Sequence, residues 1–137
     1  AMATPNPSYI LRHPSRPYLY AVQEENFGQI HSFEIDRQRP GRLIGVNQQP
    51  SIGGGPCHLS TDRAGEHLLV ANYNDGTVTL LPIDSQDGSL KIFTAYDQHL
   101  GSSVDRQRQN SAHAHCFLLD NNEEYAFSAD LGTDEIY

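Results

Sequence analysis

The sequence predicts an all-β protein, a fragment of a β-propeller with about two and a half four-stranded antiparallel blades. Short runs of Tyr, Val, Ile, Thr and Phe are separated by Gly, Pro, Asn and Asp, which is typical of strands and turns. The runs recur about every 50 residues, and a third copy is incomplete. A ring of seven blades of about 45 residues needs about 315 residues, so 137 residues supply only part of one.

Three segments carry the repeat. Each has an apolar strand, a turn, a second apolar strand, a polar turn and the start of a third strand. They read SYILRHPSRPYLYAVQEENFGQIHSFEID, CHLSTDRAGEHLLVANYNDGTVTLLPID and HCFLLDNNEEYAFSADLGTDEIY, with first turns at His13, Asp62 and Asp120. A self-contained β-sandwich is the alternative, and it explains the strands but not the period.

The repeat divides the chain into blade units at about residues 6–50, 51–110 and 111–137, the last truncated. Each expected strand is a run of β-forming residues that ends at a turn. The second unit is longer because of an extra loop between about residues 97 and 112. The expected strands are Ile10–Leu11, Tyr18–Val22, Gln29–Ile35 and Arg42–Val46 in the first unit, and Leu59–Ser60, Leu68–Ala71, Thr77–Ile83 and Leu90–Tyr96 in the second.

The charge balance limits the kinds of partner. The chain has 9 Lys and Arg against 17 Asp and Glu, a formal net charge of −8. Binders of nucleic acid or anionic membranes need a basic field, so neither partner is expected, although a local Arg cluster can still hold an anionic small molecule. No apolar run approaches the roughly 18 residues of a membrane helix. The opening residues, Ala1 to Pro5, lack the features of a secretory signal, so we expect a cytoplasmic location.

Two features of the sequence are expected to be structural. Cys57 and Cys116 lack the spacing of a zinc site, and we expect both as reduced thiols on interior strands. The segment Gly53-Gly54-Gly55-Pro56 has no following Lys-Ser/Thr or helix signal, so we expect a flexible connector between blades rather than a phosphate-binding loop.

Three phrases of the sequence resemble the lactonase family of seven-bladed β-propellers. They are NPSYILRHPSRPYLYAVQE, PCHLSTDRAGEHLLVANYNDGTVTLLPID and HLGSSVDRQRQNSAHAHCFLLDNNEEYAFSADLGTDEIY, and the likeness runs from Asn6 to Tyr137. The family includes 6-phosphogluconolactonases and carboxymuconate lactonizing enzymes. The resemblance implies hydrolysis of a sugar lactone, or the reverse ring closure, in a pocket on one face of the propeller without an obligatory metal.

The chain departs from the family pattern at three positions. Ala112 stands where the family usually has Pro before HAH, Glu135 where a basic residue is common, and Gln23 where Asn is usual. In the family a strand pair precedes the first phrase and about four blades follow the last. Those later blades contribute a further acidic residue and an Arg to the pocket.

Candidate catalytic and binding residues are most frequent between His99 and His115. Two histidines two apart on a strand project to the same face, so His113 and His115 can both look into one pocket. Lactone hydrolysis needs a base to deprotonate water, a role that suits His, and a cation for the developing oxyanion, a role that suits Arg106 or Arg108. The family phrase favours Arg108 and Gln109, with Arg106 and Gln107 as a second alignment. The predicted site residues of this stretch are His99, Arg106, Arg108, Gln109, His113 and His115.

Two other interpretations of the histidine pair stay open. Both side chains can be hydrogen-bonded polar residues at a loop edge with no catalytic role. Two ligands on a strand can also begin a zinc site, but no third ligand has suitable spacing, so we expect neither metal nor cofactor.

When the three units are aligned, their inner strands can be compared position by position. Ser8, Cys57 and His115 occupy equivalent places, and alternation puts His58 and Cys116 on the opposite face unless a bulge intervenes. Cys57 is then a neighbour of His115, and a Cys–His nucleophile pair is a further alternative.

The ends of the second strands supply the remaining candidates. Glu24 follows that strand in the first unit, where the family carries an acidic residue near the axis. Asn72 and Asp130 are assigned the corresponding places in the other two units, and all three are predicted to bind substrate. The alternative for Glu24 is a solvated turn.

Three functions are therefore compared. The first is a lactonase acting on an anionic sugar-acid lactone, with 6-phosphogluconolactone as the substrate, or its lactonizing counterpart. The second is a non-catalytic propeller that binds a ligand or protein through the same face. The third is a scaffold formed by self-association through open blade edges. In every case we expect this fragment alone to have weak activity or none.

Overall fold

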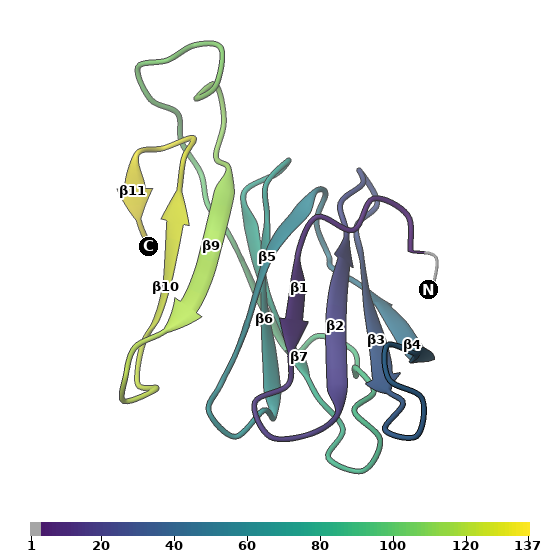
Figure 1. The fold of residues 1–137 in the computed structure, drawn as a ribbon. Coiled ribbons are helices and arrows are strands. Elements are labelled where there is room, and N and C mark those ends of the chain that lie inside the picture. Colours follow the sequence, from purple (N-terminus) through teal and green to yellow (C-terminus); the bar gives the residue numbers. More distant parts are fainter. Residues whose placement is uncertain (1–3) are drawn as a thin grey trace.

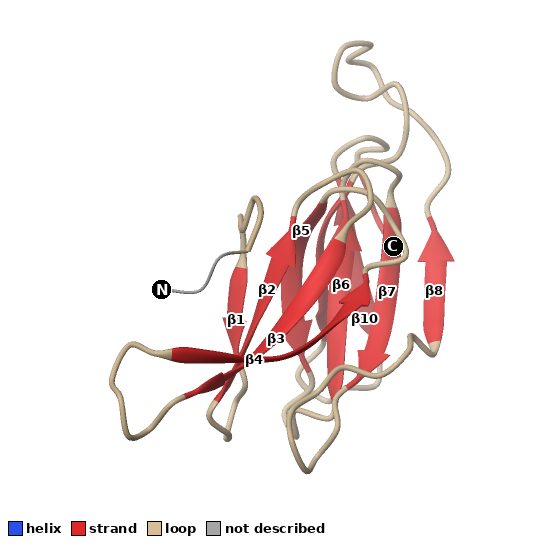
Figure 2. Cartoon of the chain, turned by 90° about the vertical axis from the view of Figure 1, so that its right-hand side faces the viewer, coloured by secondary structure: helices blue, strands red, loops and turns tan. Residues whose placement is uncertain are grey.

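The computed structural model describes residues 4–137 and contains strands and loops without a helix in that range (Figures 1 and 2). Residues 1–3, part of the opening segment considered above, lie outside the described residues. No segment of the described chain forms a helix long and apolar enough to cross a membrane. In residues 4–137, eleven strands make three antiparallel sheets, side by side in Figure 1. The predicted all-β propeller fragment is confirmed.

Each sheet is a meander in which strands adjacent in the sequence are hydrogen-bonded neighbours. The first two sheets have four strands and the third has three. The first contains β1 (Ile10–Arg12), β2 (Tyr18–Gln23), β3 (Gln29–Ile35) and β4 (Leu43–Pro50). The second contains β5 (Pro56–Thr61), β6 (His67–Asn72), β7 (Thr77–Pro82) and β8 (Ala95–Gln98). The third contains β9 (Ala114–Leu119), β10 (Ala126–Asp130) and β11 (Glu135–Ile136).

The fourth strand of the second sheet differs from the prediction. It was expected at Leu90–Tyr96, but β8 begins only at Ala95, and Leu90 makes a single bridge to Ile83. The pairing with β7 is irregular before Ala95: Lys91 N donates to Pro82 O and Thr94 N donates to Leu80 O, so three residues advance on one side against two on the other. On the side away from β7, Asn47 of β4 holds Leu90: its Oδ1 accepts from Leu90 N at 3.0 Å, and its Nδ2 donates to Leu90 O at 2.8 Å. Leu90 thus contacts both the first and the second sheet.

The main core lies between the first and second sheets. Tyr20, Val22 and Ile30 of the first sheet meet apolar side chains of the second, and all are buried. Their partners in this core are Leu59, Leu68, Val70, Leu81, Ile83 and Leu90. A smaller cluster joins the second and third sheets through Ala71, Val78 and Ala114, with Phe117 against it. Burial of this apolar surface fixes the sheets face to face.

Apolar side chains are also exposed on the two outer sheets. Ile10 on the first sheet, and Leu118, Phe127 and Ile136 on the third, are each at least 42% exposed. A sheet face of this kind is normally covered by another layer. Self-association of the chain stays a prediction, and sedimentation of the 137-residue chain tests it.

The turns between the first two strands of each sheet are built alike. In each turn His13, Asp62 or Asp120 donates its backbone N–H across the turn, and its side chain accepts backbone N–H groups. His13 is buried, its Nδ1 lies 3.2 Å from Ser15 N and 3.1 Å from Arg16 N, and its Nε2 lies 3.1 Å from Gly65 O. Because Nδ1 must accept, the neutral ring is the form that fits this turn.

Stability is predicted to fall as the pH drops below about 6.5, the pKa of an ordinary histidine. Burial is the main cause that lowers the pKa of His13. The unfolded chain therefore binds a proton at a pH where the folded chain does not, so stability is complete above that pH and is lost below it. Urea unfolding between pH 5 and 8 measures the slope.

The His13→Asn variant keeps an acceptor for the turn and is expected to flatten this pH dependence. Part of the slope will persist, because burial also lowers the pKa of His31 and of His58. An identical slope in the variant and in the original chain would contradict the assignment to His13.

Candidate functional site

The sequence-predicted residues gather at one end of the sheets, drawn at the top of Figure 1. This end carries the starts of β5 and β9 and the loops β2–β3, β6–β7 and β10–β11. The long connection over residues 99–113 also rises there. The strand meander explains the clustering, because alternate hairpin loops of antiparallel sheets lie at the same end.

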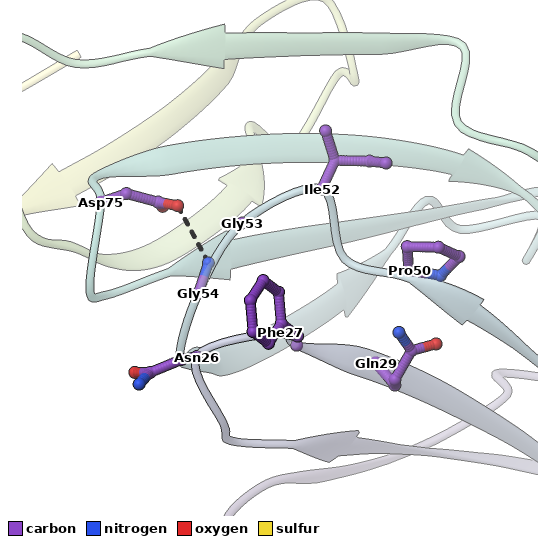
Figure 3. A pocket seen from close by; sticks show the side chains of 9 residues that line it. Asn26, Phe27, Gln29, Pro50, Ile52, Gly53, Gly54 and Asp75 are labelled. Carbon is purple, nitrogen blue, oxygen red and sulfur yellow. Dashed lines mark hydrogen bonds between the residues drawn. The ribbon is translucent and has the colours of Figure 1, made fainter.

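A groove of about 360 Å³ opens at this end between the first and second sheets (Figure 3). Phe27 is 90% exposed at its edge, and Ile52 lines it with a backbone φ of 63°, a strained conformation for a β-branched residue. Asp75 lies at the other side and accepts a hydrogen bond from Gly54 N at 2.9 Å. This groove could not be predicted from the sequence, because its lining comes from three separate loops.

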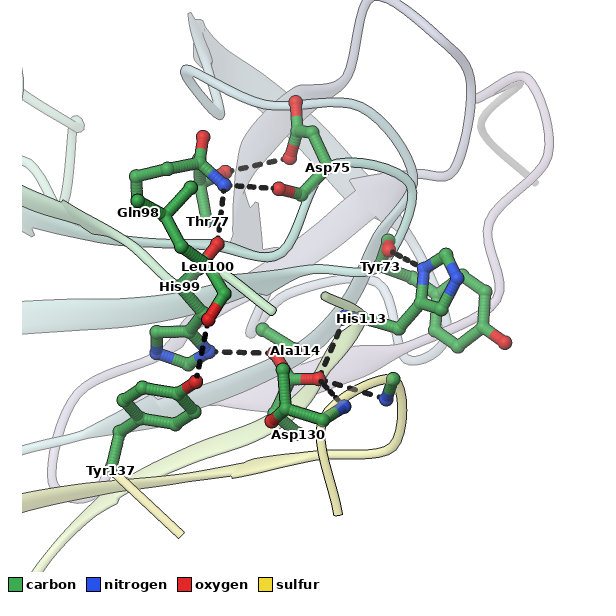
Figure 4. Close-up of polar contacts among 12 residues, drawn as sticks. Tyr73, Asp75, Thr77, Gln98, His99, Leu100, His113, Ala114, Asp130 and Tyr137 are labelled. Atoms are coloured by element: carbon green, nitrogen blue, oxygen red, sulfur yellow. Dashed lines mark hydrogen bonds and ion pairs between the residues drawn. The ribbon is translucent and has the colours of Figure 1, made fainter. Parts of the chain in front are cut away.

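His113 is held in one tautomer beside the second sheet (Figure 4). Its Nδ1 lies 2.7 Å from the backbone oxygen of Tyr73, and its ring stacks on the Tyr73 ring with centroids 4.5 Å apart. A carbonyl can only accept, so Nδ1 carries the proton and Nε2 of the neutral ring keeps its lone pair. The nearest polar contact of Nε2 is Ser111 Oγ, at the long distance of 3.5 Å. His113 therefore has a basic nitrogen that is free to accept a proton.

His115 has a different environment, although it is only two residues away. It is exposed and touches the edge of Tyr73, with centroids 5.7 Å apart. It is the extra residue of a β-bulge, because Ala114 pairs with Asp130 while Cys116 already pairs with Ala129. Tyr73 thus lies between the two histidines, and sequence reasoning missed it because a single aromatic before a turn carries no functional signal.

The bulge recurs at Cys57, where Pro56 pairs with Asn72 and His58 with Ala71. The alignment of Cys57 with His115 therefore corresponds to a shared backbone irregularity. Burial, with a smaller contribution from the charge of Glu24, raises the pKa of the Cys57 thiol to about 12. A thiol that stays protonated at neutral pH is a poor nucleophile, so the geometry does not favour a Cys–His pair.

His58 and Cys116, the residues that follow the two bulges, contact each other. Their Nε2 and Sγ atoms are 3.9 Å apart, while Phe117 N donates to His58 Nδ1 at 3.3 Å. Burial raises the pKa of Cys116 and lowers that of His58, so both groups favour their neutral forms.

Asp130 and His99 form a buried pair beneath His113. His99 Nδ1 lies 2.7 Å from Asp130 Oδ2, and the two side chains are 1% and 0% exposed. The other oxygen of Asp130 accepts from the backbone N–H groups of His113, Gly132 and Thr133 at 2.8 to 3.1 Å. Burial acts to raise the pKa of Asp130, but these hydrogen bonds outweigh it and hold the pKa below its usual value. The pair therefore lies under the surface rather than at it.

The place of His113 in the third sheet is taken by Gly55 in the second. Leu131 N donates to His113 O, just as Tyr73 N donates to Gly55 O. A Cβ on Gly55 would meet the side chain of Asn74 at 2.7 Å. In the third sheet the large and the small residue exchange places. His113 occupies the strand start where the second sheet has Gly55, and Gly132 occupies the turn where the second sheet has Asn74.

The predicted residues of the long connection have two different environments. Gln109 is buried, and its Nε2 donates to Leu131 O at 2.9 Å and Asp134 Oδ1 at 2.5 Å, which attaches the connection to the β10–β11 turn. Arg106 and Arg108 are exposed, and their guanidinium groups make no hydrogen bond or ion pair within residues 4–137. They are the cations near this end that can turn toward an anion.

Glu24 does not occupy the same place in its sheet as Asn72 and Asp130 do in theirs, although the sequence predicted that it would. Gln23 pairs with Gln29, as Asn72 pairs with Thr77 and Asp130 with Glu135. The structural counterpart in the first sheet is therefore Gln23 rather than Glu24, because the β2–β3 loop is one residue longer. Asn72 is fully buried, and its amide donates to Ser51 O at 3.1 Å.

Within the described range no group of three or more His, Cys, Asp or Glu side chains is arranged to hold a metal ion. The roles predicted for all these residues stay predictions.

Successive antiparallel sheets, packed face to face with inner strands β1, β5 and β9 in contact, define a β-propeller. The sequence profile described as "Lactonase, 7-bladed beta-propeller" matches residues 1–137. The chain belongs to this lactonase family.

Named relatives and solved structures resemble the chain over nearly its whole length. The 6-phosphogluconolactonase of Bacillus subtilis is 31% identical over 133 residues, covering 96% of this chain and 37% of the relative. That of Formosa agariphila is 32% identical, covering 96% and 38%. The structure of a periplasmic gluconolactonase from Pseudomonas aeruginosa superposes with a TM-score of 0.91 at 32% identity, covering 99% and 39%. The chain thus spans under two fifths of the length of these relatives.

Replacement of Gly132 by Ala is predicted to displace the start of β9. The added Cβ would lie 1.8 Å from Ser111 O and 2.8 Å from His113 N, both backbone atoms. We expect a loss of about 1–3 kcal/mol of unfolding free energy, as for other overpacked sites. Chemical denaturation measures it, and NMR of His113 reports the displacement.

Gly41→Ala is the control, because a Cβ there meets nothing within 4 Å and only its positive φ opposes the change. The His113 resonances should stay unchanged in this control. Equal His113 shifts in both variants would contradict a local effect of Gly132.

Proposed function

We propose that the protein of which this chain forms part hydrolyses a sugar-acid lactone, with 6-phosphogluconolactone as the substrate. The observation that carries the proposal is the basic Nε2 of His113, left open by the bond from Nδ1 to Tyr73 O. The printed names of the Bacillus and Formosa relatives support this substrate. The periplasmic relative leaves the cellular location a prediction.

In this proposal His113 acts as the general base. Its Nε2 takes a proton from a water molecule, whose oxygen then attacks the lactone carbonyl carbon. The negative charge that develops on the carbonyl oxygen needs a nearby cation or donor, for which Arg106 and Arg108 are the candidates. The protonated His113 then returns its proton to the ring oxygen as the carbon–oxygen bond breaks. In the lactonizing direction the same residues act in reverse order.

His113 suits the role of base better than His115 does. His113 is half-buried, its ring is fixed by the stack on Tyr73 and by the bond from Nδ1 to Tyr73 O, and its backbone N–H is bound to Asp130 Oδ1. His115 is exposed and makes only an edge contact with Tyr73. A base in a fixed orientation loses less of its catalytic advantage to misalignment, so His115 is assigned to substrate contact.

The His113→Ala variant of the full-length protein is predicted to lower kcat for lactone hydrolysis by about 10²- to 10⁴-fold, the usual contribution of a general base. His115→Ala should cause a smaller loss. Hydrolysis is followed by the release of acid, with the spontaneous reaction subtracted. His67→Ala is the control, because His67 pairs with Asp62 at the opposite end of the sheets.

Unchanged turnover in both His113→Ala and His115→Ala would overturn the catalytic proposal. It would favour a propeller that binds a ligand at the same face without turning it over.

A second prediction concerns the phosphate of the substrate. Arg108→Gln should raise KM for the phosphorylated lactone about 10-fold, the effect of one charge-assisted hydrogen bond, and leave KM for the unphosphorylated lactone nearly unchanged. The same measurement on Arg106→Gln decides between the two alignments of the RQ phrase. Arg37→Gln, in the turn after β3, is the control. An equal effect on both lactones would contradict a phosphate contact.

A further inference from the structure

We propose that Asp130 and His99 form a positioning pair that sets the orientation of His113. The inference rests on the proposed function of His113 as the base. Neither residue reaches the reacting atoms, because both side chains are buried and bonded to each other. They act through the backbone of His113 instead.

The Asp130 carboxylate lies between the start of β9 and the β10–β11 turn. Its Oδ1 accepts from His113 N at 2.8 Å, at the residue where β9 begins. The same oxygen accepts from Gly132 N and Thr133 N in the β10–β11 turn. One atom therefore fixes the strand start to the neighbouring turn.

The His113 ring is bound to the neighbouring sheet. Its Nδ1 must meet Tyr73 O, which belongs to the second sheet, while its backbone belongs to the third. The bond thus spans two sheets, and a small shift of the His113 backbone moves Nδ1 away from its acceptor. Loss of this bond would let the other tautomer form, in which Nε2 carries the proton and cannot act as a base.

His99 stabilises the buried carboxylate of Asp130. A carboxylate oxygen without a partner is costly in a buried place, and His99 Nδ1 supplies that partner for Asp130 Oδ2 at 2.7 Å. His99 is itself fixed, since its ring stacks on Tyr137 with centroids 3.9 Å apart and its backbone N donates to Gly76 O at 3.0 Å. The pair therefore also attaches the long connection to the same strand start (Figure 4).

A second carboxylate–histidine pair, at the opposite end of the sheets, provides a control for this arrangement. Asp62 pairs with His67 Nδ1 at 2.8 Å and accepts from the backbone N–H groups of Glu66 and His67. This is the same chemistry, a carboxylate with one histidine and backbone donors, but it supports no site residue. Substitution there tests the general effect of losing such a pair.

The test compares four variants of the full-length protein: Asp130→Asn, His99→Ala, His99→Asn and Asp62→Asn. We expect Asp130→Asn and His99→Ala to lower kcat about 10- to 100-fold, because a misplacement of about 1 Å at a reacting group can cost about 100-fold, with little change in KM. His99→Asn should restore much of the activity, because its amide N–H can replace the donor of His99 Nδ1. Asp62→Asn should lower stability but leave kcat unchanged.

Nitrogen NMR of the His113 ring gives a second measurement that does not depend on turnover. Wild type should contain the tautomer with the proton on Nδ1, and Asp130→Asn should contain a mixture of both. The wild-type tautomer and wild-type kcat in both Asp130→Asn and His99→Ala would overturn the positioning pair. So would an equal loss of kcat in Asp62→Asn, because the effect would then be general destabilisation.

The outcomes separate this proposal from the proposed function. Failure of the proposed function is seen as full activity in both His113→Ala and His115→Ala, and the tautomer measurement still decides the positioning role. Failure of the positioning pair alone is seen as an inactive His113→Ala protein with fully active Asp130 and His99 variants.

Discussion

The buried carboxylate of Asp130 is the interaction on which the candidate site depends. It accepts from His99 and from three backbone N–H groups, so it joins the long connection, the start of β9 and the β10–β11 turn. A charge in this environment is tolerated only when its hydrogen-bonding capacity is filled. The segments that supply the donors are therefore held in one arrangement, and His113 is held with them.

The internal repeat explains how one blade can carry a site that the others lack. All three sheets use the same hairpin frame, and the turns at His13, Asp62 and Asp120 are stabilised by the same kind of side-chain acceptor. At the opposite end the frame is kept but the side chains change, with Gly55 at the strand start of the second sheet and His113 in the third. The candidate site therefore differs between sheets in its side chains and not in its hairpin frame.

The sequence predicted features that depend on local residue patterns, and it failed for features that depend on pairing between strands. Strands β3 and β6 were predicted almost to the residue, because the pattern of apolar runs and turn residues is local. The predicted bounds Leu90–Tyr96 were wrong for β8, because the pairing with β7 is interrupted between Lys91 and Thr94, and apolar patterning does not show such an irregularity. The register of Glu24 was wrong by one residue, because the loop between β2 and β3 has one residue more than the corresponding loops of the other two sheets.

The sequence by itself determined the all-β class, the blade repeat and the gathering of histidines and arginines in one stretch, since these depend on composition and spacing. Only the tertiary structure distinguished His113 from His115 and brought Tyr73 between them. It also placed His99 and Asp130, 31 residues apart, in one buried pair. The physical reason is that tautomer, burial and hydrogen-bond partner are properties of contacts between sheets, which the order of residues along a strand does not contain.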